Sequence, residues 1–101
     1  NRLSDTVNET LVFYQQGLNI NMIAAERNVK ESTIYMHIAE AIEVGLLVAR
    51  DVLGLRDEDY AEIVRMIESF DEDDKGHLKP VYDAFEGQYN YGVLRCVKAG
   101  L

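Results

Sequence analysis

The sequence predicts an all-α domain, and three observations support that fold class. Apolar residues recur mostly at intervals of three and four, the spacing of a helix that buries one face. The single proline, Pro80, stands where it can begin a helix instead of breaking one. Glycine or asparagine follows several of the periodic stretches, and both tolerate the left-handed backbone that ends many helices. We therefore expect helices joined by short turns along almost the whole chain.

Three helices are expected in the first half of the chain. Their apolar stripes place them at about residues 4–16, 20–27 and 31–44. Ser4 or Asp5 can cap the first helix and Asn19 the second, because these side chains accept hydrogen bonds from free N–H groups. The residues expected to take the turns that follow are Gly17, Asn28 and Gly45.

The second half of the chain predicts a smaller helical unit. Residues 46–55 carry β-branched side chains without a helical stripe, so a short strand and an irregular connector both remain open. The acidic run at residues 71–76 is expected to be a loop. Asn90 can cap the last helix. The helices expected in this half cover about residues 58–70, 78–85 and 91–99.

The net charge of −8 argues against strong electrostatic attraction to nucleic acid. Residues 1–50 hold four basic and six acidic side chains, whereas residues 51–101 hold six basic and twelve acidic ones. The excess lies mainly in two acidic runs, at residues 57–59 and 71–74. Any contact with DNA is therefore expected to be weak and largely non-specific.

No sequence feature indicates a membrane span, a metal centre or a disulfide. No apolar stretch approaches the roughly 20 residues of a membrane-spanning helix, and the start at Asn1 without a leader suggests a piece of a longer chain. The two histidines and Cys96 lack the spacing of metal ligands. The run 71–82 departs from a calcium loop at Lys75 and Tyr82. The lone cysteine fits a reducing compartment, so we expect a cytoplasmic location.

The second and third expected helices carry the pattern of a helical pair joined by a tight turn. Ala24 is small enough for a helix crossing, and Asn28 tolerates a positive φ at the turn. Val29 is expected to act as an apolar plug after the turn. Ile34 and Ile38 then continue the apolar stripe on the next helix. This is the pattern of a helix-turn-helix.

The two halves of the chain are expected to pack together as one domain. Residues 1–50 form the predicted helix-turn-helix subdomain, which is winged-helix-like at most. Residues 51–101 form an acidic helical subdomain that packs against the first.

The start of the third expected helix is the candidate DNA contact. Free N–H groups and hydroxyls at this end can bind a phosphate, and two larger side chains can touch sugar or base. The outer face continues with Ala39, Glu40 and Glu43, where sequence-specific readers usually carry Arg, Lys, Asn or Gln. His37 is either a half-buried residue bonded to the adjoining helix or a phosphate contact. The candidate DNA-binding residues are Arg27, Lys30, Ser32, Thr33, Tyr35 and Met36.

Residues 9–45 resemble the helix-turn-helix domain at the C-terminus of many bacterial RecQ-family helicases. That family has a helix ending in Gly, an I-x-x-I-A helix, a turn, and the segment S-T-I/V-Y-x-H-I/L. The matching residues are Ile20, Ile23, Ala24, Ser32, Thr33, Ile34, Tyr35, His37 and Ile38. The second half is similar through residues 78–80 (LKP) and 91–95 (YGVLR), so the resemblance covers about residues 4–101. Asn28 stands where family members often have Gly.

The resemblance implies a non-catalytic accessory domain that positions or regulates an ATP-dependent DNA helicase acting in recombination or repair. The parent chain would hydrolyse ATP with Mg²⁺. This chain lacks the G-x-x-x-x-G-K-[S/T] phosphate loop, so no cofactor is expected in it.

Two alternative functions remain open. One is a protein–protein interaction module without DNA contact, which uses the acidic half as its surface. The other is a LuxR-type transcriptional regulator, against which the acidic face of the third helix argues. A basic rim formed by Arg2, Arg27, Lys30 and Arg50 would favour DNA, and scattered placement of these residues would favour protein.

Overall fold

The computed structural model describes residues 3–74 and 78–101, with residues 71–74 described by their backbone alone. Every regular element in these ranges is a helix, which confirms the predicted all-α fold class. The helices are α1 (Asp5–Gln15), α2 (Ile20–Arg27), α3 (Glu31–Glu43), α4 (Ala49–Leu53), α5 (Asp57–Asp74), α6 (Lys79–Ala84) and α7 (Tyr91–Ala99). Among the described residues, no helix is both long and apolar enough to cross a bilayer.

The ends of the helices follow the local chemistry of the sequence. The side chains of Ser4, Asn19 and Asn90 each accept a hydrogen bond from the backbone N–H three residues on, at distances of 2.8 to 3.4 Å. These three predicted caps are confirmed. Gly17 and Gly45 have φ values of 96° and 84°, so both take the left-handed turn that was expected of them. Pro80 lies in the first turn of α6, where its missing N–H breaks no helical bond.

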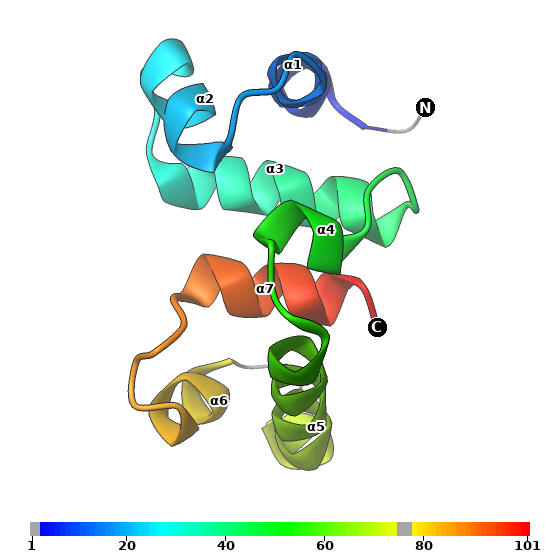
Figure 1. Ribbon diagram of the computed structural model, residues 1–101, viewed down its shortest axis with the longest axis vertical. Coiled ribbons are helices and arrows are strands. Elements are labelled where there is room, and N and C mark those ends of the chain that lie inside the picture. The colour runs from blue at the N-terminus through cyan, green and yellow to red at the C-terminus, as the bar shows by residue number, and fades with distance from the viewer. Residues whose placement is uncertain (1–2, 75–77) are drawn as a thin grey trace.

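The helix α3 lies in the middle of the molecule (Figure 1). The helices α1 and α2 pack on one side of it and α7 runs alongside on the other, while α5 and α6 lie beyond α7. One apolar cluster surrounds α3 and includes Ile23, Ile34 and Ile38, which have no exposed surface. A second cluster joins α5, α6 and α7.

The helix α7 connects the two apolar clusters. Its Cys96 is fully buried in the cluster around α3. Leu94 and Val97, which are also fully buried, belong to the second cluster. One short helix therefore contributes to the packing of both halves of the chain.

Residues 46–55 form no strand, and the irregular connector expected as the alternative is interrupted by a short helix. They contain α4, a helix of five residues that ends at Gly54 with a φ of 64°. Ala49 is 2% exposed and anchors this helix in the cluster around α3. The helix is too short for an apolar stripe to reveal it, and packing of Ala49, Val52 and Leu53 on the cluster around α3 stabilises it instead.

The expectation of a loop at residues 71–76 is wrong for residues 71–74, because α5 continues through Asp74. No glycine or proline interrupts the sequence from Asp57 to Asp74, so nothing stops the helix after Phe70. Lys75 and Gly76, which belong to the same expectation, lie outside the described residues.

Candidate nucleic-acid interface

A left-handed turn joins α2 to α3. Asn28 has φ 57° and ψ 46°, and its N–H group donates to the carbonyl oxygen of Ala25 at 3.2 Å. The N–H of Val29 donates to the carbonyl oxygen of Ala24 at 3.0 Å, which closes the end of α2. Lys30 then returns to an extended conformation as the N-cap residue of α3. The tight turn expected at Asn28 is confirmed.

The residue buried at the apolar contact between α2 and α3 is Ala24, whereas Val29 is exposed. Ala24 is 5% exposed and lies in the same cluster as Ile34 and Ile38. Val29 is 39% exposed, so its predicted role as an apolar plug is wrong. The turn at Asn28 leaves the following residue outside the helix–helix contact, and the buried side chain of Ile34 fills the core there instead.

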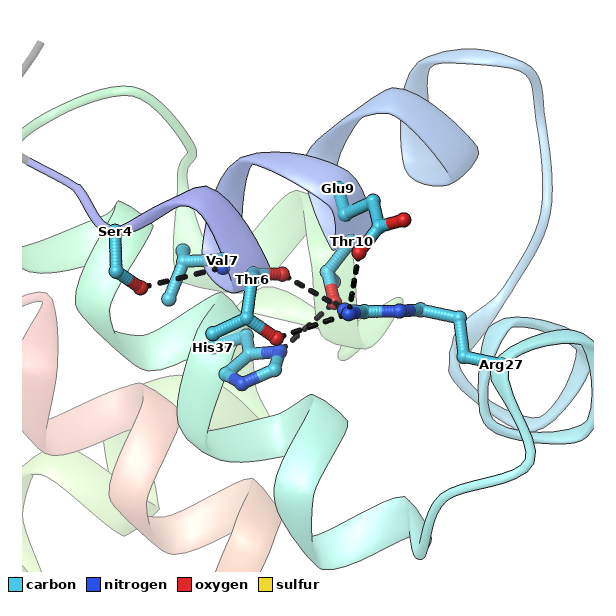
Figure 2. Close-up of polar contacts among 7 residues, drawn as sticks. All are labelled: Ser4, Thr6, Val7, Glu9, Thr10, Arg27 and His37. Carbon is cyan, nitrogen blue, oxygen red and sulfur yellow. Dashed lines mark hydrogen bonds and ion pairs between the residues drawn. The ribbon is translucent and has the colours of Figure 1, made fainter.

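Arg27 holds α2 against α1 through a network of hydrogen bonds (Figure 2). Its guanidinium group donates to the carbonyl and the hydroxyl oxygen of Thr6, at 2.7 and 2.9 Å, and also to the hydroxyl of Thr10. The same group pairs with the Glu9 carboxylate at 2.8 Å. The Arg27 side chain is only 12% exposed. Its donors therefore face α1, and sequence reasoning from composition alone missed this internal role.

His37 extends the same network into α3. Its Nδ1 lies 2.8 Å from the Thr10 hydroxyl, and the side chain is 8% exposed (Figure 2). Because Arg27 donates to the Thr10 oxygen, the Thr10 O–H can donate to an unprotonated Nδ1. Burial lowers the pKa of His37 and the nearby Arg27 charge lowers it further, whereas Glu40 acts in the opposite direction. The histidine bonded to an adjoining helix is confirmed, and the alternative of a phosphate contact is wrong because the ring is buried.

The first turn of α3 remains open to solvent. Lys30 and Ser32 are exposed, Thr33 is half-buried, and no side chain caps the helix at Lys30. Met36 is 48% exposed one turn further along. The described residues form no ion pair with Lys30. This end of α3 presents one cation, two hydroxyls and the positive end of a helix dipole, to which Glu31 adds an opposing charge.

The helix α7 covers another side of α3. Tyr35 is half-buried, and its ring packs so closely on Gly92 that a Cβ there would overlap the ring and lie 2.8 Å from Tyr35 Cβ. The Cys96 thiol lies 3.6 Å from the Tyr35 carbonyl oxygen. Ala39, expected on the outer face, is 5% exposed. The expectation for Ala39 is wrong because α7 packs there, and the small residues Ala39 and Gly92 are the sequence signals of that contact.

The six predicted site residues thus fall into two groups, those that are exposed on α3 and those that contact another helix. Lys30, Ser32, Thr33 and Met36 lie on the exposed part of α3, whereas Arg27 bonds to α1 and Tyr35 packs against α7. The exposed strip of α3 continues toward its C-terminus only through Glu40 and Glu43.

The described residues do not show the basic rim that would favour DNA, which was to be formed by Arg2, Arg27, Lys30 and Arg50. Arg50 pairs with Asp57 at 3.2 Å and lies over the Tyr60 ring, with 5.8 Å from its Cζ to the ring centroid. Arg27 is engaged with α1, and Arg2 lies outside the described residues. Only Lys30 of this set is described as exposed and without an ion pair. No three metal-ligating side chains gather in the part of the chain that the structure describes.

Comparison with known protein families gives one match. A family model described as a helix-turn-helix domain matches residues 6–98, which is nearly the whole chain. The searches of curated proteins and of solved structures found no match.

Proposed function

The chain belongs to this helix-turn-helix domain family, and we propose that it is a non-catalytic accessory domain of a RecQ-family ATP-dependent DNA helicase. The family match by itself names only the helix-turn-helix. The residues that support the helicase are the S-T-I-Y-x-H-I segment at 32–38, LKP at 78–80 and YGVLR at 91–95. In this proposal ATP and Mg²⁺ bind only in the parent motor, which acts in the cytoplasm in recombination or repair.

We further propose that the domain contacts DNA weakly, through phosphates at the start of α3. The observation that carries this proposal is the exposed first turn of α3, with Lys30 and the Ser32 hydroxyl beside free helical N–H groups. Such a helix end binds phosphate oxygens without reading sequence. Base readout is not supported, because α7 covers Tyr35 and the exposed strip ends in Glu40 and Glu43.

Fluorescence anisotropy with labelled single-stranded and duplex oligonucleotides tests the contact. We expect dissociation constants of about 10⁻⁴ M or weaker at physiological salt, the weak end of non-specific binding. With Arg27 engaged, only one or two phosphates are neutralised, so the log–log salt slope should be about −1 to −2.

Two substitutions that make the same change of charge separate the proposed contact from bulk electrostatics. Lys30→Glu should remove most of the binding. Lys79→Glu, on α6, is the matched control, and it should leave binding nearly unchanged. Equal losses from both would show that net charge, and not the α3 end, controls the affinity.

A protein–protein interaction module is the second candidate function. It is favoured because Arg27 and Arg50 each pair with a carboxylate of the chain itself, so few basic side chains remain to bind phosphates. Absence of binding to any oligonucleotide at low salt would support this candidate over the first. Tight binding to one duplex sequence that survives high salt would contradict both and favour a LuxR-type regulator.

A further inference from the structure

A groove of about 550 Å³ lies between α3 and α7, and its lining on α3 begins at Met36, one turn after the proposed phosphate contact. Its wall on the α3 side runs from Met36 to Glu43, and its wall on the α7 side includes Arg95 and Lys98. The small residues Ala39 on α3 and Ala99 on α7 also line it. The span from residue 36 to residue 43 corresponds to about two helical turns, or about 10 Å.

The two walls of the groove carry opposite charges. Glu40 and Glu43 stand exposed on the α3 side, and Arg95 stands exposed on the α7 side with Lys98 one turn later. Among the described residues, Glu40, Glu43 and Arg95 form no ion pair. The groove is therefore locally balanced in charge, although the chain as a whole carries −8.

Exposed apolar side chains accompany these charges. Met36 is 48% exposed, and Leu101, which also lines the groove, is 59% exposed. Apolar surface flanked by charged rims is typical of surfaces that bind another protein. A channel between two helices that run side by side is shaped for a third helix, whose ridge of side chains packs between them.

We propose that the groove between α3 and α7 binds an amphipathic helix of a partner protein. About two turns of that helix insert apolar side chains between Met36 and Leu101. Basic side chains on one flank of the helix face Glu40 and Glu43, and acidic side chains on its other flank face Arg95. This surface is separate from the acidic helix α5 and does not depend on the proposed DNA contact.

Neither DNA nor a second copy of the chain fits the groove as well. The two glutamates on the α3 wall repel phosphates. Two copies would carry −8 each, and a groove that faces a groove leaves both unfilled. A helix with two differently charged flanks meets both rims and fills the space.

A set of three designed peptides tests the proposal. Each is a fluorescein-labelled helix of about 18 residues with leucines at intervals of three and four. One has lysines on one flank and glutamates on the other; the second has lysines on both flanks, and the third has glutamates on both. Net charge alone predicts that the all-lysine peptide binds this acidic chain best. The proposal predicts that the mixed peptide binds best, by about tenfold or more.

Charge-reversal variants of the groove provide a matched control. Glu40→Lys with Glu43→Lys should weaken binding of the mixed peptide by about tenfold, and so should Arg95→Glu with Lys98→Glu. The combination of all four substitutions keeps the net charge at its original value. It should restore binding, because the helix can lie in the reverse direction with its flanks exchanged.

The location of the peptide is measured by NMR of ¹³C-methyl methionine. The chain has three methionines, and only Met36 lines the groove. The Met36 signal should shift on addition of the mixed peptide, while those of Met22 on α2 and Met66 on α5 stay in place. Preference for the all-lysine peptide, insensitivity to the reversals, or a shift at Met22 instead would overturn the proposal. So would a dimer of the chain that broadens the Met36 signal without peptide.

Discussion

Gly92→Ala tests how closely α7 packs on α3. A Cβ on Gly92 would lie 2.8 Å from Tyr35 Cβ and would overlap two atoms of the Tyr35 ring. Overpacking of this kind typically costs about 1–3 kcal/mol. Alanine regains at most about 1 kcal/mol of helix propensity, and less near a helix start, where Gly92 lies. We therefore expect a net loss of about 1–2 kcal/mol in the free energy of unfolding.

The loss should lower the thermal midpoint by about 5–15 °C for a domain of this size, followed by circular dichroism of the helical signal. A double-mutant cycle with Tyr35→Ala identifies the cause, because that change removes the overlapping ring atoms and leaves only the Cβ contact. Gly92→Ala should cost much less in the Tyr35→Ala background. An unchanged or higher midpoint in the native background, or the same cost in both backgrounds, would refute close packing of α7 on Tyr35.

Four further predictions follow from the same contacts. Ala24→Leu should cost about 1–3 kcal/mol by overpacking the α2–α3 contact, and a melt with an unchanged midpoint would contradict this. Because the pKa of His37 is lowered on folding, its contribution to stability is complete above pH 6.5, the ordinary value, and is lost as the pH falls toward the folded pKa. His37→Gln should flatten this decline in denaturant titrations at several pH values. Burial raises the pKa of Cys96 to about 12, so a thiol reagent should modify it only after denaturation; rapid modification of the native chain would contradict its burial. The purified chain should show no ATPase activity, and activity abolished by a point change within it would overturn the non-catalytic assignment.

The helix ends could be predicted from sequence because their causes are local. The caps at Ser4, Asn19 and Asn90 depend on one side chain and an N–H three residues away. The left-handed turn at Asn28 depends on the residue's own tolerance of positive φ. Neither requires knowledge of what packs nearby.

The errors at the candidate site concern features that only the tertiary structure decides. Apolar spacing shows that α3 buries a face, but it cannot show that α7 covers Ala39 and Tyr35 as well. Likewise, the number of basic residues cannot show that the Arg27 guanidinium donates its hydrogen bonds to α1. The sequence therefore predicted which segment carries the candidate site. Only the fold shows which of its residues are exposed and which are held in contacts with other helices.

The packing of α7 also indicates whether the two predicted subdomains, residues 1–50 and 51–101, fold separately or together. We propose that residues 1–50 and 51–101 form one folding unit, because α3 and α7 each depend on the other half. Without α7, the Tyr35 ring and Ala39 would lose their cover, and the cluster around α3 would lose Cys96. Without α3, the face of α7 that carries Cys96 would lie in water. The second half thus completes the core of the helix-turn-helix, and in doing so it narrows the exposed face of α3 to a strip.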